Sequence, residues 1–230
     1  MFDRFNKKTL CIFAVIVLGV SSLSAKDTAT FVDLGFSSDG ATFMFAQYGV
    51  HSGTLKAWAD LGVVDVAGSS FVQDGRVSYT NDRPVVFGQD GSGAFHTALV
   101  KNVPLVQRNK IDHTVQGRPL FISIGGKDTN EIQFRNFETG ALYRASLIQT
   151  SEGRGVSLAS SFHINLVREA KDGTRTSCTV GAPQFKRAMV SSYQIRQVRV
   201  YGTSMVLVIE MTKLEAGQPT IRYMVETVHF

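Results

Sequence analysis

Five histidines are the side chains of this sequence best suited to acid–base or metal chemistry, and they are widely spread along it. No two stand four residues apart, the helical spacing with which paired histidines bind zinc, and no pair of neighbouring cysteines supports such a site. We therefore expect no metal site and no cofactor. The five histidines are His51, His96, His113, His163 and His229.

Motifs for nucleophilic catalysis and phosphate binding are also missing from the sequence. The chain contains neither Gly-x-Ser-x-Gly nor Ser-x-x-Lys. Gly125-Gly126-Lys127 is not a phosphate loop, because Phe121 replaces the first glycine and Asp128 replaces the hydroxyl residue. These absences favour a protein that is not an enzyme. A Ser–His–Asp set assembled in space stays open, since triads are recognised by geometry and not by sequence order.

The candidate binding residues surround the connection between two predicted strands. The loop at residues 49–56 contains His51, follows Tyr48 and precedes Trp58. An apolar surface and hydrogen-bonding groups can converge at such a place, and loops often carry function because their backbone is not committed to a sheet. The alternative is a hairpin connection whose aromatic neighbours fill the core.

Most of the chain that positions these residues has the pattern of β-strands. Residues 162–166 alternate between apolar and polar side chains, as in a half-buried strand. At Gln197 a similar alternation changes phase, which predicts a bulge or a change of partner strand. Residues 205–209 are continuously apolar and predict a central strand, and residues 221–228 predict the closing strand.

One segment has the spacing of a helix instead. Apolar residues recur at helical intervals between residues 95 and 106, Ser92 can cap the start, and Pro104 breaks or kinks the helix. No linker divides the strand-rich segments on its two sides. We therefore predict a single, mainly β domain over residues 26–230: an antiparallel β-sandwich or partly open barrel with one short α-helix near residues 92–103.

The first 25 residues are typical of a secretory signal peptide. Three basic residues precede the apolar run at residues 10–20, and Leu23-Ser24-Ala25 follows it. Because a membrane-spanning helix needs about 20 apolar residues, we expect cleavage after Ala25 and no stable membrane insertion afterwards. Lys26 stands where a lipoprotein signal requires cysteine, so no lipid anchor is expected.

The net charge and the cysteine content of the chain limit the kinds of partner that it is expected to bind. The chain carries a formal charge of +5, and residues 1–25 hold three bases and one acid, so the remainder carries +3. Such a surplus, without a dense basic cluster, does not indicate nucleic acid as a partner.

Cys178 is the only cysteine after residue 25 and forms no internal disulfide. It is expected to be a buried, inert thiol, with a reactive or intermolecular role as the alternative.

The opening segment carries a first resemblance. Residues 31–40 contain the turn Phe36-Ser37-Ser38-Asp39-Gly40, and an aromatic-rich strand follows. This resembles a single blade of a TolB-type β-propeller, in which a phenylalanine-serine-proline-aspartate-glycine turn precedes the returning strand. Only one copy of this turn exists here, and a propeller needs at least four blades of about 40 residues. The resemblance therefore implies a local hairpin and not a full propeller.

A second resemblance covers nearly the whole chain after the signal. Several segments resemble an uncharacterised family of bacterial predicted secreted proteins with a domain of unknown function. They are the opening at residues 35–40, residues 193–201 and 205–209, Leu214-Glu215-Ala216-Gly217, and Ile221-Arg222-Tyr223 with its arginine-aromatic pair. The family's C-terminal glycine-phenylalanine-glutamate-glycine is only partly matched. The resemblance implies export and a shared fold, and it brings no activity.

Together these observations predict an exported, periplasmic or secreted, non-catalytic binding or cell-envelope-associated module. Its expected partner is an envelope protein, a peptide or a glycan. The alternatives are a periplasmic hydrolase and a small outer-membrane β-barrel, the latter because Val228 and the terminal Phe230 resemble a barrel signal. Arg222 and Glu226 share the face of Val228, and charges on a lipid-facing row cost roughly 2–4 kcal/mol at mid-bilayer, which counts against the barrel.

Overall fold

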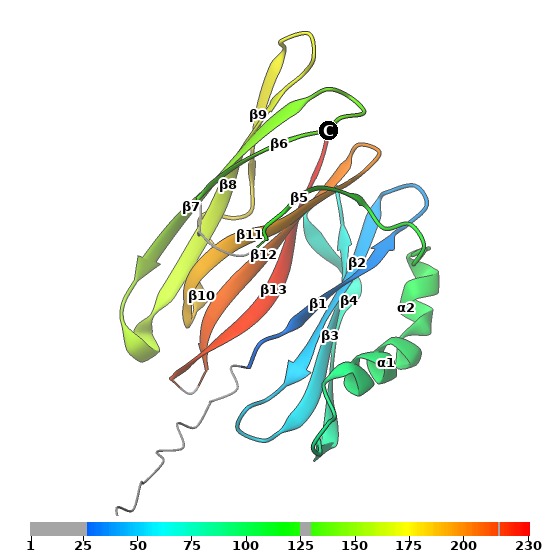
Figure 1. Ribbon diagram of the computed structural model, residues 1–230, viewed down its shortest axis with the longest axis vertical. Helices are drawn as coiled ribbons and strands as arrows, with labels where there is room; N and C mark the ends of the chain where they lie inside the picture. Colours follow the sequence, from blue (N-terminus) through cyan, green and yellow to red (C-terminus); the bar gives the residue numbers. More distant parts are fainter. Residues whose placement is uncertain (1–26, 125–129, 216) are drawn as a thin grey trace, which may run out of the picture.

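Three antiparallel sheets and a pair of helices make up the fold (Figure 1). The structure, a computed structural model, describes residues 27–124, 130–215 and 217–230, and the expected signal peptide lies outside them. The N-terminal sheet has the order β1 (Thr30–Phe36), β2 (Thr42–Val50), β3 (Lys56–Asp65) and β4 (Ser70–Pro84). The central sheet has the order β13 (Gln218–His229), β12 (Ser204–Glu215), β11 (Val190–Tyr201) and β5 (Arg118–Ile122).

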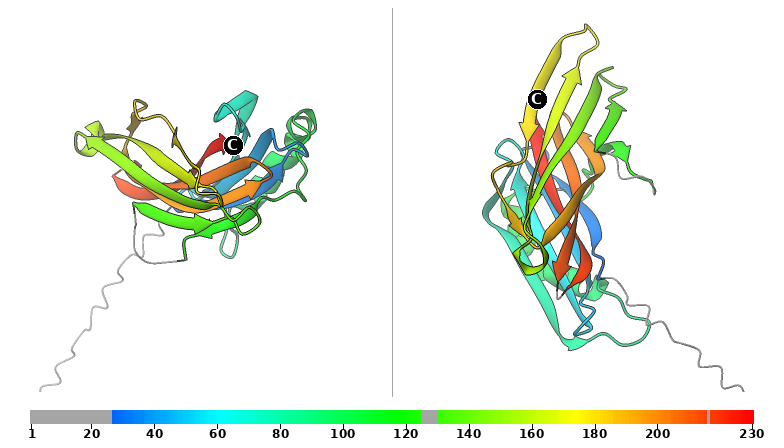
Figure 2. Two further views of the ribbon diagram at one scale, coloured as in Figure 1. Left: turned by 90° about the horizontal axis from the view of Figure 1, so that it is seen from above. Right: turned by 90° about the vertical axis from the view of Figure 1, so that its left-hand side faces the viewer.

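The third, outer sheet is built from the middle of the chain. Its order is β10 (Arg187–Ala188), β8 (Ala159–Glu169), β7 (Leu142–Glu152) and β6 (Glu131–Arg135), and β9 (Arg175–Val180) also pairs with β8. A 3-10 turn, η1 (Gly155–Ser157), connects β7 to β8. The two further views show the hairpin of β8 and β9 extending beyond the other strands (Figure 2).

The layers are held together by three buried apolar clusters. Helices α1 (Ser92–Lys101) and α2 (Val103–Arg108) cover one face of the N-terminal sheet. The opposite face of that sheet packs on the central sheet, where Phe43 meets Val208. The other face of the central sheet packs on the outer sheet through residues such as Leu207 and Ile164. The layers therefore follow the order helices, N-terminal sheet, central sheet and outer sheet.

Alternation along β3 decides what each face of the N-terminal sheet contacts. Ala57, Ala59 and Leu61 are buried in the cluster that includes α1. Trp58 points to the opposite face, because successive side chains of a strand alternate between the two faces of the sheet. A single strand therefore supplies both the core beneath the helices and part of the groove described below.

The mainly β, sandwich-like prediction is confirmed, and so are its strongest details. β12 lies between β11 and β13, and Met205 to Ile209 are completely buried. The register of β11 against β12 shifts between Ile195 and Gln197, so the phase change in the sequence marks a β-bulge.

The helical segment differs from the prediction of one short helix. Two helices form, and Pro104 lies in the first turn of α2, where a proline is tolerated because its missing N–H has no intrahelical acceptor there. The predicted cap is also wrong. The residue that caps α1 is Gly91, and the Ser92 hydroxyl donates instead to the carboxylate of Asp90.

Candidate functional site

A groove of about 730 Å³ lies between the N-terminal sheet and the edge of the central sheet. Phe45 and Phe71 line it from β2 and β4, and Tyr223 and Met224 line it from the edge strand β13. Phe185, in the segment that leads to β10, completes the apolar part of the lining. The groove is therefore enclosed by side chains from all three sheets or their connections.

A glycine allows the two phenylalanines to lie across the strand that forms the groove wall. A Cβ atom at Gly62 would lie 2.6 Å from the Phe45 ring and 3.0 Å from the Phe71 ring. The two ring centroids are 6.4 Å apart, within the range of aromatic packing. Any side chain at Gly62 would displace these rings.

One end of the groove is closed by a buried ion-pair cluster. Arg222 donates from Nη1 to Asp27 Oδ1 at 2.9 Å and from Nη2 to Asp27 Oδ2 at 3.0 Å. Its Nη2 also donates to Glu215 Oε2 at 2.9 Å, and Lys213 Nζ lies 3.2 Å from Glu215 Oε1. The Arg222 guanidinium stacks over Trp58 at 4.5 Å. Two carboxylates and two cations are thus paired around one indole ring.

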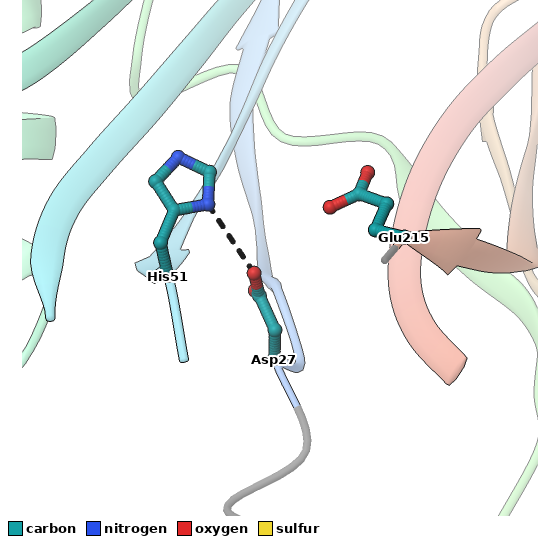
Figure 3. A group of neighbouring side chains, drawn as sticks. All are labelled: Asp27, His51 and Glu215. Atoms are coloured by element: carbon teal, nitrogen blue, oxygen red, sulfur yellow. Dashed lines mark hydrogen bonds and ion pairs between the residues drawn. The ribbon is translucent and has the colours of Figure 1, made fainter. Parts of the chain in front are cut away.

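His51 joins this cluster from the β2–β3 connection. Its Nδ1 lies 3.3 Å from Asp27 Oδ2, and its ring stacks on Trp58 with centroids 5.6 Å apart. Figure 3 shows His51, Asp27 and Glu215 converging, and their ligand atoms all lie within 4.8 Å of one another. These donor types suit a divalent cation. However, Arg222 already bonds both carboxylates, so a cation would have to compete with a guanidinium for the same oxygens.

Arg187, a lining residue at the other end of the groove, contacts a second buried charge, Glu226. Ser69 donates its hydroxyl to Glu226 Oε2 at 3.1 Å, and Arg187 Nη2 lies 3.9 Å from Oε1. Burial raises the pKa of Glu226, an effect that the Ser69 hydrogen bond and the Arg187 charge oppose. Arg187 also packs against aromatic rings, the nearest being Phe185 at 4.9 Å and Phe162 at 5.1 Å.

Two buried hydrogen-bond donors of residues that line the groove lack partners in the described part of the chain, and the exposed Arg76 lies near them on the lining. The indole Nε1 of Trp58 is buried without an acceptor, on a side chain that is only 4% exposed. Nη1 of Arg187 is also buried without one. Arg76 forms no ion pair among the described residues, and its guanidinium lies 5.8 Å above the Phe71 ring. Buried donors are nearly always satisfied in folded proteins, so the Trp58 indole N–H and Nη1 of Arg187 point to an absent acceptor.

The structure brings together two of the three residues that the sequence proposed for binding. His51 and Trp58 both line the groove. Tyr48 lies on the opposite face of the N-terminal sheet, where its ring stacks on Phe95 of α1 at 5.5 Å. Tyr48 pairs with Ala59, whereas Trp58 pairs with Gly49, and these adjacent positions face opposite sides.

Other residues of the groove were not predicted. Asp27 and Arg222 are separated by 195 positions, and no local pattern connects them. Arg187 follows a turn-like segment with no recognisable motif. One signal was present in the sequence: Arg222 and Glu226 are charges among the apolar residues of one predicted strand, and buried charges are rare unless they are paired or functional.

The histidines considered for a hydrolase site lie elsewhere. His113 Nδ1 is 2.7 Å from the carbonyl oxygen of Leu34, and the His96 ring packs on Phe95 at 5.0 Å. His163 is half-buried on β8. Within the described ranges, none of the three is hydrogen-bonded to both a carboxylate and a hydroxyl.

These features define a layered, antiparallel β protein with a partly apolar groove between its sheets. The family described as "Predicted secreted protein (DUF2259)" matches residues 44–229, more than half of the chain, and the chain belongs to this family. The family resemblance in the sequence is therefore confirmed, whereas the match lends no support to a TolB-type blade. No curated protein and no solved structure matches. Neither helix of the described residues is long and apolar enough to span a membrane.

Proposed function

We propose that this chain is an exported, non-catalytic binding protein of the periplasm or cell envelope, and that its groove holds a small ligand with an apolar body and acceptor or acidic groups. The observation that carries this proposal is an apolar groove whose lining holds the buried, unpartnered indole N–H of Trp58 and two incompletely paired arginines, Arg76 and Arg187. His51 and Trp58 are the binding residues retained from the sequence prediction. Tyr48 has a packing role in this account.

The size and lining of the groove suit a small ligand. Ligand pockets have volumes of roughly 300–1,000 Å³, and most are apolar with a few convergent polar groups. The groove volume of about 730 Å³ and its aromatic lining match that description. A ligand that supplies acceptors to the buried donors would recover about 1–3 kcal/mol for each donor.

The unpaired groups also favour one kind of ligand over another. Both buried groups are donors, and Arg187 carries a positive charge, as does the exposed Arg76 on the same lining. A glycan would require acceptors as well as donors from the protein, because each sugar hydroxyl both donates and accepts. A ligand rich in acceptors, or carrying a carboxylate, therefore suits the groove better.

The proposal is tested by titrating the mature chain with Nile red, an uncharged dye whose fluorescence increases in apolar sites. We expect saturable binding to the natural sequence and at least tenfold weaker binding to Ala188→Trp. Ala188 is exposed at the groove wall, so a large side chain there fills the groove without removing a core residue. The matched control is Ala170→Trp, in the turn between β8 and β9. Equal binding by all three proteins, or no saturable binding, would overturn the proposal.

A further inference from the structure

We infer that the groove binds the carboxyl terminus of a short, apolar peptide, with the terminal carboxylate at Arg76 and Arg187 and a main-chain carbonyl at Trp58. This inference rests on the proposed binding function and specifies its ligand. It follows from the distribution of charge and of unpartnered donors along the groove.

The charges at the Asp27 end are balanced. Arg222 is bonded to Asp27 and Glu215, and Lys213 is also paired with Glu215. Asp60, on the groove wall nearby, accepts from the Ser78 hydroxyl at 2.6 Å. Among the described residues, the arginine and the lysine at this end are therefore both compensated by carboxylates.

The charges at the opposite end are not balanced. Arg187 and Arg76 both line the groove, and the only acid that pairs with either of them in the described residues is Glu226. That contact spans 3.9 Å and leaves Nη1 of Arg187 without an acceptor. Two guanidinium groups on the groove lining, of which only that of Arg187 contacts an acid, form a site for an additional anion. A carboxylate is a suitable anion, since guanidinium groups bind carboxylates with strong, charge-assisted hydrogen bonds.

The distance between the two ends sets the length of the ligand. Arg76 pairs with Gly62 in the β3–β4 ladder, and Trp58 lies four positions from Gly62 along β3. Four residues of a strand span about 13 Å. The lining between these positions is largely apolar and includes the rings of Phe45 and Phe71.

A peptide terminus matches this arrangement better than a simple fatty acid does. An alkyl carboxylate satisfies the two arginines but has no acceptor for the indole N–H at the far end. An extended peptide of about four residues spans the same distance, and it offers both a terminal carboxylate and main-chain carbonyls. Its apolar side chains would contact the aromatic lining.

The test is competition against Nile red by acetyl-Leu-Ala-Val-Leu with a free carboxyl terminus and by the same peptide with a terminal amide. We expect the free carboxylate to compete about tenfold better than the amide with the natural sequence, as loss of a charge-assisted bond implies. Arg76→Gln and Arg187→Gln should each remove most of that preference. Arg76 is exposed, so its variant remains informative if Arg187→Gln fails to fold. Arg175→Gln, an exposed arginine of β9, is the matched control and should preserve the preference.

Trp58→Phe separates the two ends of the ligand, since it keeps an aromatic ring there but removes the indole N–H together with part of the indole. It should weaken both peptides by the same factor and preserve the preference for the carboxylate. Equal competition by the carboxylate and the amide would overturn the inference. Stronger competition by dodecanoate than by either peptide, insensitive to Trp58→Phe, would replace the peptide with a fatty acid. In both cases saturable dye binding would leave the proposed function standing, whereas its absence would end both proposals.

Discussion

Replacing Arg222 by methionine should destabilise the protein far more than the loss of an ordinary surface charge. The Arg222 side chain is 10% exposed and makes two hydrogen bonds to the carboxylate of Asp27, whose side chain is 4% exposed. Removing the guanidinium leaves a buried carboxylate without its counter-charge, which costs about 3–5 kcal/mol. The lost stacking on Trp58 adds about 0.5–2 kcal/mol. Together these terms amount to a large fraction of the 5–15 kcal/mol that is typical of a folded domain.

The assay is urea unfolding followed by circular dichroism, with Lys186→Met as the matched control. Lys186 Nζ lies 2.8 Å from Glu152, but both side chains are 57% exposed, so its loss should cost only about 0–1 kcal/mol. Adding Asp27→Asn to Arg222→Met should recover part of the stability, because the unpaired charge is then removed. If Arg222→Met unfolds at the same urea concentration as Lys186→Met, the cluster does not stabilise the fold and our reasoning about it is wrong.

Three further predictions follow from other parts of the molecule. Mass spectrometry of the exported protein should find a chain that begins at Lys26, and an intact Met1 in the membrane fraction would contradict cleavage. Tyr48→Ala should lower the melting temperature and leave Nile red affinity unchanged, because Tyr48 packs on α1 and faces away from the groove; a loss of affinity without destabilisation would show that Tyr48 belongs to the site. Burial raises the pKa of Glu226 above its ordinary value of 4.5. Protonation of Glu226 therefore contributes fully to the free energy of unfolding below pH 4.5, and this contribution is lost as the pH rises through the raised pKa. As the pH rises above about 4.5, the unfolding free energy of the natural sequence should therefore fall relative to that of Glu226→Gln, and parallel profiles would contradict this assignment.

The strands could be predicted from the sequence where the local pattern of apolar residues matches the burial seen in the structure. The continuous apolar run at residues 205–209 predicted a strand covered on both faces, and the change of phase at Gln197 predicted the bulge. The position of the helical segment was predicted correctly, but its division into two helices was not. Pro104 interrupts a helix when it lies in the interior, yet it starts one when it lies in the first turn, and spacing alone does not distinguish these positions.

Only part of the candidate site could be predicted from the sequence, because strand register and the packing of the sheets bring its residues together. The sequence places Tyr48 and Trp58 on either side of one loop, but the register of β2 against β3 sends them to opposite faces. Asp27 reaches Arg222 because the start of the chain runs beside β13, where Thr28 forms a parallel bridge with Ile221. The sequence pattern around Asp27 and the pattern around Arg222 give no indication that the two residues are in contact.

The measurement that tests the central claim most directly uses the single tryptophan of the chain. Trp58 gives one indole N–H signal in a ¹H–¹⁵N correlation spectrum, and that N–H is the unpartnered donor in the groove. On titration with Nile red, we predict that this signal shifts progressively and saturates with the natural sequence, and that it stays unchanged with Ala188→Trp once the signal of the added indole is set aside. If the dye binds while the Trp58 signal of the natural sequence does not move, the ligand lies elsewhere and the groove is not the binding site.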